Sequence, residues 1–220
     1  MKVVVFDFDG TLVSRDSFID FSVRYCLRRP WRLLLVGPLL PLALLWALRS
    51  ERTAGAILLW AMTVGGSTRR FVLALRRYAL GTLPHYARDA VFQELTGHLR
   101  AGDRVIIATG SLPLLVRGLL AARNLGRLPI VGTRLRRKAG GLVTEIHCTG
   151  QIKVAELQRR FGILEWSTVY TNSFADSPLM SQARDITLVC PSKRSLLATQ
   201  RLIVPGTTLR VLAHDAVPRA

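Results

Sequence analysis

The sequence predicts an α/β fold in which a parallel sheet is interrupted, after its first strand, by a long helical insertion. Short, continuously apolar runs such as residues 3–6 and 104–108 alternate with helical segments in the second half of the chain. Such runs are typical of strands that are buried on both faces, as in a parallel sheet. Residues 14–98, in contrast, are mostly helical in pattern. We therefore expect a sheet domain made of residues 1–13 and 99–220, with a helical insertion over 14–98.

The individual elements follow from their local patterns. Residues 3–6 predict an apolar strand that ends in Asp7-Phe8-Asp9-Gly10-Thr11, where the glycine indicates a turn. The insertion is expected to begin with a helix at about 16–30, followed by apolar segments at 33–48 and 54–64 and a polar helical stretch to about residue 99. Further strands are expected at 104–108, 129–134, 142–146, 167–171 and 185–190, and further helices at 112–124, 152–161 and 193–202.

The composition indicates a folded protein with a strongly basic surface. Half of the 220 residues are hydrophobic and the mean hydropathy is +0.29, which excludes a disordered or fibrous chain. Lys and Arg number 31 against 14 Asp and Glu, so the net charge is +17. Such a surface favours nucleic acid, anionic lipid headgroups or phosphorylated substrates. The basic cluster at residues 134–138 lacks interleaved aromatic residues, so it favours a solvated face or a hairpin turn, and we expect no nucleic-acid partner.

The N-terminus and the cysteines indicate the compartment. No apolar stretch of signal-peptide length precedes Asp7. The three cysteines, Cys26, Cys148 and Cys190, have no metal-binding or redox spacing, and we expect them to be reduced and buried. These features predict that the sheet domain lies on the cytoplasmic side.

Polar groups follow the first two strands of the predicted sheet. Asp7 and Asp9 come directly after the first strand, and side chains two residues apart in an extended chain share a face. Thr109, Gly110 and Ser111 end the next strand and open a helix, where hydroxyl and backbone N–H groups can bind a phosphate. Taken singly, each group is explained equally well by a turn or a helix cap.

Two later segments add an amine, an amide and a further carboxylate. Lys153 lies at the start of a predicted helix, where it presents a positive charge or is simply a solvated lysine. Asn172 and Asp176 follow the strand at 167–171. Because functional loops of such sheets lie at the carboxyl ends of the strands, we expect all these groups to converge in one crevice suited to phosphoryl transfer.

In this order, the motifs resemble those of the haloacid dehalogenase superfamily of phosphohydrolases. The four matching motifs are Asp7-x-Asp9-Gly10-Thr11, Thr109, Lys153 and the loop that carries Asn172 and Asp176. The resemblance spans nearly the whole chain and implies a Rossmann-like sheet with a helical cap of subclass IB, like that of the phosphoserine phosphatases. More narrowly, the chain is similar to the phosphatidylglycerophosphatase C group at residues 26–30, 38–41, 58–60, 108–111, 148–157 and 176–180.

The resemblance implies a catalytic role for four residues. Asp7 is the expected nucleophile, which forms an aspartyl-phosphate. Asp9 is the expected general acid for the leaving alcohol and then the base for water. Thr109 is expected to hold a phosphoryl oxygen, and Lys153 to neutralise charge on the transferring group and on Asp7.

Ligands for the substrate and for Mg²⁺ are implied as well. Gly110 and Ser111 are expected to bind the substrate phosphate. Asp16 is either a substrate contact or the N-cap of the helix that begins near residue 17. Mg²⁺ is the implied cofactor. Its expected site residues are Asp7, Asp9 through its backbone carbonyl, Asn172 and Asp176.

Asn172 departs from the family pattern, which usually has an aspartate at this position as a direct metal ligand. An amide oxygen can bind Mg²⁺ but carries no charge, so weaker metal affinity is expected. Asp176 is expected to hold a metal-bound water. The departure leaves open a slow or metal-demanding enzyme, or a homologue that has lost turnover and only binds anionic lipid.

The apolar part of the cap, about residues 31–66, predicts contact with a membrane. Its uncharged run at 33–48 is shorter than the ~20 residues that a straight spanning helix needs. Pro38 and Pro41 predict a break just before Pro38, and arginines flank the run on both sides. We expect a re-entrant dip or a pair of interfacial helices that turns at 37–41, with a spanning anchor or a buried core helix as alternatives.

These features together predict a Mg²⁺-dependent phosphomonoester hydrolase at the cytoplasmic face of the cell membrane. The predicted substrate is phosphatidylglycerophosphate, the product phosphatidylglycerol, and the further partner an anionic membrane surface. The alternatives are a soluble phosphatase that acts on a small metabolite such as phosphoserine, and a catalytically weakened lipid-binding homologue. The sequence carries no signal for an oligomeric state.

Overall fold

A parallel sheet forms the centre of the molecule. The computed structural model describes residues 2–47 and 51–212. Six strands lie in the order β3-β2-β1-β6-β7-β8, and every neighbouring pair is parallel. The strands are β1 (Val3–Phe6), β2 (Arg104–Ala108), β3 (Ile130–Val131), β6 (Trp166–Thr171), β7 (Ala183–Val189) and β8 (Thr208–Leu212). The predicted α/β class with a parallel sheet is confirmed, and β1 lies between β2 and β6.

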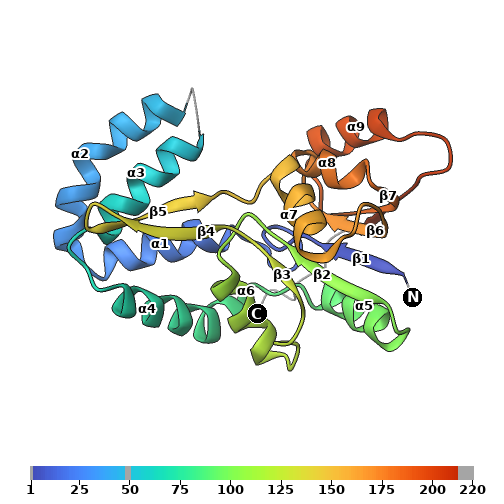
Figure 1. Cartoon of the computed structure of the whole chain (residues 1–220), viewed down its shortest axis with the longest axis horizontal. Coiled ribbons are helices and arrows are strands. Elements are labelled where there is room, and N and C mark those ends of the chain that lie inside the picture. The colour runs from blue at the N-terminus through green and yellow to red at the C-terminus, as the bar shows by residue number, and fades with distance from the viewer. Residues whose placement is uncertain (1, 48–50, 213–220) are drawn as a thin grey trace.

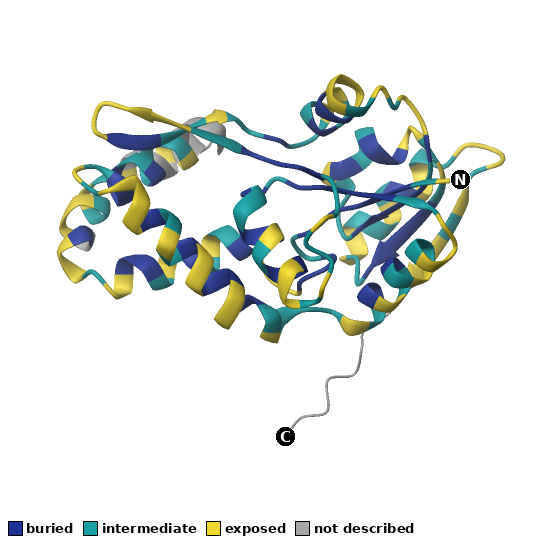
Figure 2. Ribbon diagram, turned by 60° about the horizontal axis from the view of Figure 1, so that its bottom comes forward, coloured by how far each residue is buried: buried dark blue, intermediate teal, exposed yellow. Residues whose placement is uncertain are grey.

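Helices cover both faces of this sheet because successive residues of a strand point to opposite sides. Phe6 of β1 belongs to one apolar core, and the neighbouring Val5 belongs to a second one on the other face. The first core includes α5 (Asp89–Arg100) and α6 (Pro113–Ala122), and it continues into the helices of residues 17–79. The helices of the second core are α7 (Gln151–Phe161), α8 (Ser177–Met180) and α9 (Lys193–Leu202). Figure 2 shows the central strands as buried and the outer helix faces as exposed.

The chain between β1 and β2 forms a helical cap at one end of the molecule (Figure 1). Its elements are α1 (Ser17–Leu27), α2 (Pro30–Ala47), α3 (Glu51–Thr63), α4 (Thr68–Gly81) and the short η1 (Leu83–Tyr86). The last helix before β2 is α5, which packs against β2 rather than against the cap helices. The division into domains at 1–13, 14–98 and 99–220 stays a prediction.

The expected break in the apolar segment is wrong. Pro38 and Pro41 both lie inside α2, which continues without interruption to Ala47, so the chain does not turn at 37–41. A proline removes one backbone donor, but a helix that is held by its neighbours can absorb this loss. The neighbour here is α3: the buried Arg32 of α2 donates hydrogen bonds to the carbonyl oxygens of Met62, at 2.5 Å, and Val64, at 3.2 Å.

The end of the apolar run, at Leu48 and Arg49, lies outside the described residues. Within the part of the chain that the structure describes, no helix combines the length and the apolar character needed to cross a bilayer.

A separate two-stranded sheet corrects the expectation for residues 129–146. The strand at 142–146 does not join the parallel sheet, because β5 (Gly141–Ile146) pairs antiparallel with β4 (Arg134–Lys138). The basic cluster at 134–138 therefore lies in a hairpin, one of its two expected settings. The hairpin lies against α3, where Thr63 accepts the backbone N–H of Leu142 at 2.8 Å and Trp60 donates to the carbonyl of Ala139 at 3.0 Å.

The last strand and one cysteine differ from the expected fold. β8 was not expected from the sequence, and it closes the sheet edge beside β7. Cys26 and Cys148 are buried thiols as expected, whereas Cys190 is only half-buried.

Candidate active site

The predicted polar groups converge at the carboxyl ends of three adjacent strands. Asp7 and Asp9 follow β1, Ser111 lies beyond β2, and Asn172 follows β6. Because these strands are parallel neighbours, their carboxyl ends meet at one edge of the sheet. Together with Lys153 from α7 and other residues, these side chains line one cleft of about 920 Å³.

Lys153 is the centre of a buried ion-pair network. Its Nζ lies 2.8 Å from Oδ1 of Asp7 and 2.7 Å from Oδ1 of Asp176. The other oxygen of Asp176 accepts the hydroxyl of Thr171 at 2.8 Å. Both carboxylate oxygens of Asp176 therefore receive protein donors, and this residue holds the amine against Asp7. Its predicted role at a metal stays a prediction.

The network contains two carboxylates and one amine, so a further positive charge beside it is favourable. Burial raises the pKa of Asp7, and the charge of Lys153 opposes that effect. Burial also disfavours the charged form of Lys153, but attraction to Asp7 and Asp176 outweighs it and raises the pKa of the amine. Oδ2 of Asp7 meets the hydroxyl of Thr11 only at a long 3.5 Å. This oxygen is the one that can attack phosphorus or bind a cation.

Asp9 is held by the beginning of the cap. Its Oδ1 accepts the backbone N–H of Ser17, the first residue of α1, at 2.8 Å. The hydroxyl of Ser17 in turn lies 2.8 Å from the hydroxyl of Ser111. The fully buried Ser17 thus joins the first predicted motif to the second one. Ser17 was not predicted as a site residue. The one local signal was its position directly after Asp16, the N-cap residue of α1, because the helix holds the backbone N–H of its first residue in a fixed direction.

The segment after β2 forms a turn that leads into helix α6. The hydroxyl of Thr109 accepts the backbone N–H of Ser111 at 2.9 Å, which leaves its own proton free to be donated. Thr109 is fully buried, and Gly110 and Ser111 line the cleft above it. The hydroxyl of Thr133 binds the carbonyl of Gly110 at 2.5 Å and fixes this turn from behind.

Asn172 lies against the turn that follows β1. Gly10 has a φ of +74°, and a Cβ at this position would lie 2.1 Å from Nδ2 of Asn172. The glycine is therefore required both by the backbone angle and by the close approach of the amide. Asn172 lines the cleft together with Asp7 and Asp9.

The cap forms the outer wall of the cleft. Asp16 lines the cleft and also caps α1, because its Oδ1 accepts the N–H of Ile19 at 2.8 Å. Both alternatives for Asp16 are thus compatible with its position. His147 and Thr149 line the cleft as well. They were missed because nothing in their local pattern indicates that the end of the β4–β5 hairpin reaches the site.

The oxygen donors of the cleft fit Mg²⁺. Among the described residues, no cluster of three or more His, Cys, Asp or Glu side chains is arranged for a metal. Asp7 and Asn172 nevertheless line the cleft together with Asp9 and offer a carboxylate and an amide oxygen. The backbone carbonyl of Asp9 stays the predicted further donor. Mg²⁺ prefers such oxygen ligands and retains several waters, so a small protein donor set is sufficient.

Without a metal, we expect the stability of the protein to fall as the pH rises. Burial raises the pKa of Asp9 from 3.8 to about 6, although the hydrogen bonds from Ser17 oppose this shift. The folded state then binds more protons than the unfolded state between these values, so its free energy of unfolding decreases through that window. Because Asp9 is only half-buried, the expected loss between about pH 4 and pH 6 is roughly 1 kcal/mol.

Urea denaturation in EDTA measures this dependence, with Asp9→Asn as the matched variant. Asparagine still accepts the N–H of Ser17 but does not titrate, so the slope of stability with pH should become flatter. Equal slopes for the wild type and the variant would contradict the assignment.

Comparisons with known proteins agree with this architecture. Residues 4–181 match the family model of the haloacid dehalogenase-like hydrolases. Protein CicA of Caulobacter vibrioides is 29% identical over 188 residues, which cover 82% of each chain. A protein of unknown function from Bordetella pertussis Tohama I has a similar structure, with a TM-score of 0.69 and 18% identity over 94% of this chain and 97% of that one.

A phospho-aspartyl intermediate analogue of phosphoserine phosphatase also shares the fold. Its TM-score is 0.54 and its identity 17%, over 95% of this chain and 92% of that one. The match to the family model covers most of the sheet and the whole cap. The chain belongs to the haloacid dehalogenase-like hydrolase family.

Proposed function

We propose that the protein is a phosphomonoester hydrolase that works through a phosphorylated Asp7. The observation that carries this proposal is the buried amine of Lys153 between Asp7 and Asp176, at the carboxyl end of the central strand. A buried cation beside a carboxylate with one uncommitted oxygen is suited to attack on a phosphorus that carries negative oxygens. The hydrolase family of the chain supports the same chemistry.

We propose that Asp9 carries out the proton transfers, which its place in the same cleft as Asp7 and its raised pKa support. Oδ2 of Asp7 forms a bond to phosphorus while the bond to the ester oxygen breaks, and protonated Asp9 gives its proton to the leaving alcohol. Asp9 then takes a proton from the water that attacks the same phosphorus, which releases phosphate and restores Asp7. Lys153 compensates charge on the transferred group throughout. Mg²⁺, held by Asp7, Asn172 and the carbonyl of Asp9, would supply further positive charge beside the phosphate oxygens.

A small phosphorylated metabolite is the substrate class that the comparisons support best. One structural neighbour is phosphoserine phosphatase, and its chain is covered almost completely. The cap contributes Asp16, Phe18 and Ile19 to the lining of the cleft. A cleft of this kind suits a compact substrate whose non-phosphate part fits beneath the cap.

A lipid phosphomonoester such as phosphatidylglycerophosphate is the second candidate, and it rests on a specific surface. Ile19, Val23 and Leu27 lie at successive turns of α1 and are 62%, 54% and 65% exposed. Ile19 also lines the catalytic cleft, so an exposed apolar row begins at its mouth. Trp31 and Leu34 of α2 are exposed as well. We propose, for this candidate, that the row lies against the cytoplasmic face of the cell membrane.

A substrate panel separates the two candidates. Phosphate release is measured from phosphoserine, from p-nitrophenyl phosphate and from phosphatidylglycerophosphate in mixed micelles, each with and without Mg²⁺. A kcat/KM for phosphoserine at least about tenfold above that for the lipid supports the small-metabolite reading, and the reverse ratio supports the lipid. No release from any of the three would favour the weakened lipid-binding homologue and contradict the hydrolase proposal.

Restoring a carboxylate at position 172 is expected to strengthen Mg²⁺ binding. Asn172→Asp adds one negative charge to the oxygen donors around Asp7, and hard cations respond strongly to ligand charge. The dissociation constant for Mg²⁺ should fall by about tenfold, and the Mg²⁺ concentration for half-maximal activity should fall with it. Calorimetric titration with Mg²⁺ and steady-state rates measure the two quantities separately. An unchanged metal affinity in the variant would place Asn172 outside the metal site.

A further inference from the structure

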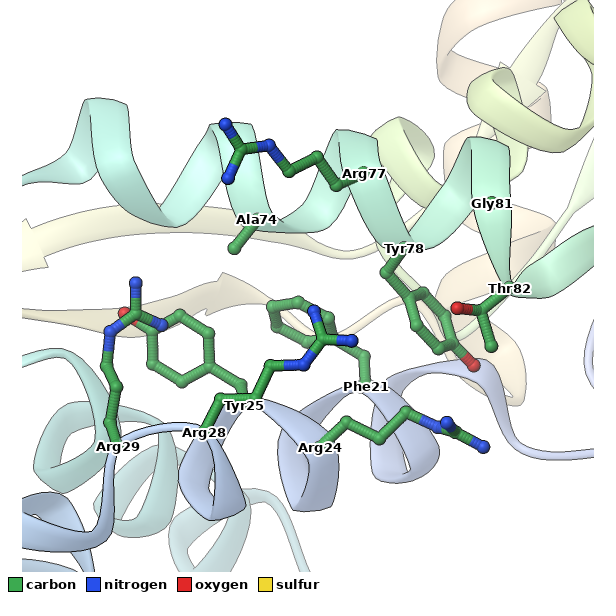
Figure 3. A pocket seen from close by; sticks show the side chains of 10 residues that line it. All are labelled: Phe21, Arg24, Tyr25, Arg28, Arg29, Ala74, Arg77, Tyr78, Gly81 and Thr82. Atoms are coloured by element: carbon green, nitrogen blue, oxygen red, sulfur yellow. The ribbon is translucent and has the colours of Figure 1, made fainter.

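A second cleft lies between two helices of the cap. It has a volume of about 480 Å³, and its walls are formed by α1 and α4. Four arginines line it, as Figure 3 shows: Arg24 from α1, Arg28 and Arg29 directly after that helix, and Arg77 from α4. The lining residues are different from those of the catalytic cleft.

The floor of this cleft is aromatic and rigid. Phe21, Tyr25 and Tyr78 are only 2%, 6% and 6% exposed. Phe21 packs edge-on against Tyr78, with their ring centroids 5.6 Å apart. The hydroxyl of Tyr78 is bound to Asp20 at 2.8 Å. The rings are therefore committed to the core of the cap, and they exclude water beneath the arginine side chains without offering a free stacking surface.

Two of the four arginines already have partners. Nε of Arg24 lies 2.7 Å from Asp20, and another nitrogen of Arg24 lies 2.9 Å from the hydroxyl of Tyr86. Arg29 lies over the ring of Tyr25, with 4.2 Å from Cζ to the ring centroid. This stacking orients the guanidinium but does not neutralise it.

The other two arginines supply uncompensated charge. Within the part of the chain that the structure describes, Arg28 and Arg77 form no ion pair, and both side chains are exposed at the rim. Three positive charges, those of Arg28, Arg29 and Arg77, thus surround an apolar floor without a carboxylate of their own. Guanidinium groups in such a setting bind phosphate oxygens through charge-assisted, often bidentate hydrogen bonds.

We propose that this arginine cleft binds the phosphate groups of an anionic ligand, at a site separate from the catalytic one. At roughly 30 Å³ per water-sized group, its volume accommodates about fifteen non-hydrogen atoms. That size fits the headgroup of an anionic phospholipid or a soluble polyphosphate. The inference does not depend on the proposed hydrolase activity, because the arginine cleft and the Asp7 cleft have no lining residue in common.

The surroundings of the cleft decide which source to test first. Arg24 lies in the last turn of α1 and Arg28 is the C-cap residue of that helix; the exposed Val23 and Leu27 directly precede them. A row of exposed apolar residues therefore runs beside the row of arginines on the same helix. This is the arrangement in which apolar side chains enter a lipid surface while the cations meet the headgroups.

The test compares two double variants that remove the same charge. Arg28→Gln with Arg77→Gln removes the unpaired cations of the cleft. Arg69→Gln with Arg70→Gln removes two exposed arginines from the same helix α4, outside the cleft. Binding is measured at about 0.15 M salt, where exposed charges beyond about 8 Å are screened. The probes are phosphatidylcholine vesicles with and without phosphatidylglycerol, and sodium tripolyphosphate in a calorimetric titration.

We expect the cleft variant to lose affinity for at least one probe by about tenfold or more, and the control variant by less than about threefold. Loss toward the phosphatidylglycerol vesicles identifies a lipid headgroup as the source, and loss toward tripolyphosphate identifies a soluble ligand. Equal losses of affinity in both variants would show that binding depends only on the net charge of the protein, and would overturn the proposal. A wild-type protein that binds neither probe would overturn it as well.

Catalysis provides the independent readout. Hydrolysis of p-nitrophenyl phosphate should be unchanged in the cleft variant, and Asp7→Asn should bind the probes as the wild type does. Failure of the hydrolase proposal would therefore leave this result unaffected. If the double cleft variant no longer unfolds cooperatively on heating, the single variant Arg77→Gln replaces it. We expect this single change to alter the logarithm of the dissociation constant by about half as much as the double change.

Discussion

Asp7→Asn is expected to lower phosphate release by about four orders of magnitude or more, because the amide cannot act as the nucleophile. The measurement is the steady-state rate with p-nitrophenyl phosphate and phosphoserine at saturating Mg²⁺. The matched control is Asp89→Asn, the same chemical change at a carboxylate whose side chain is 74% exposed at the start of α5. This control should keep the wild-type rate.

The same variant should not be less stable than the wild type in EDTA. Asp7 and Asp176 share the single amine of Lys153 in a buried site, so two carboxylates compete for one positive charge. Replacing one of them with a neutral group removes part of this excess negative charge. A retained rate in a folded Asp7→Asn protein would end the proposal that Asp7 is the nucleophile.

Lys153→Met is expected to impair both activity and stability. The amine lies within 2.8 Å of both carboxylates and is 5% exposed, so its removal leaves two buried acids without a partner. Breaking a buried ion pair from one side costs about 3–5 kcal/mol, and the lower value is expected here because the acids can take up a proton. The rate of phosphate release should fall by about 10²–10³-fold, as for the loss of one charge that stabilises a transition state.

A double variant separates the two effects. Lys153→Met combined with Asp176→Asn removes the amine together with one of the acids, so urea denaturation at neutral pH should show a partial recovery of stability. Phosphate release should remain low, because the cation beside Asp7 is still missing. If the double variant recovered the rate as well, Lys153 would be a structural residue rather than a catalytic one.

The candidate catalytic cleft was predictable because the position of its residues follows from a rule that applies to short segments of sequence. Asp7 and Thr109 each come after a run of mostly buried, apolar residues, and Asn172 comes after the largely buried strand β6. Such strands lie parallel, and their carboxyl ends meet. Because β2, β1 and β6 are neighbours in the sheet, the groups that follow them lie close together. Lys153 was found through its place at the start of a helix between two such strands.

The interactions that the sequence did not reveal are those between distant segments. Ser17 connects Asp9 to Ser111 through one backbone N–H and one hydroxyl, and no local pattern distinguishes it from other serines near a helix start. The same holds for the proline-containing helix α2. Local preference predicts a break before Pro38, but packing of α2 against α3, which includes the hydrogen bonds of Arg32, compensates for the missing donor.

The sequence by itself determined the class of sheet, the residues at its functional edge and the chemistry that they can perform, because burial of a strand and the direction of its end are local properties. Only the tertiary structure decided that the 134–146 segment forms a hairpin against the cap, and that arginines at and after the end of α1 line a common cleft with Arg77 of α4. Pairing and packing between segments far apart in the chain depend on shape and on competing partners, and neither is present in a short window of sequence.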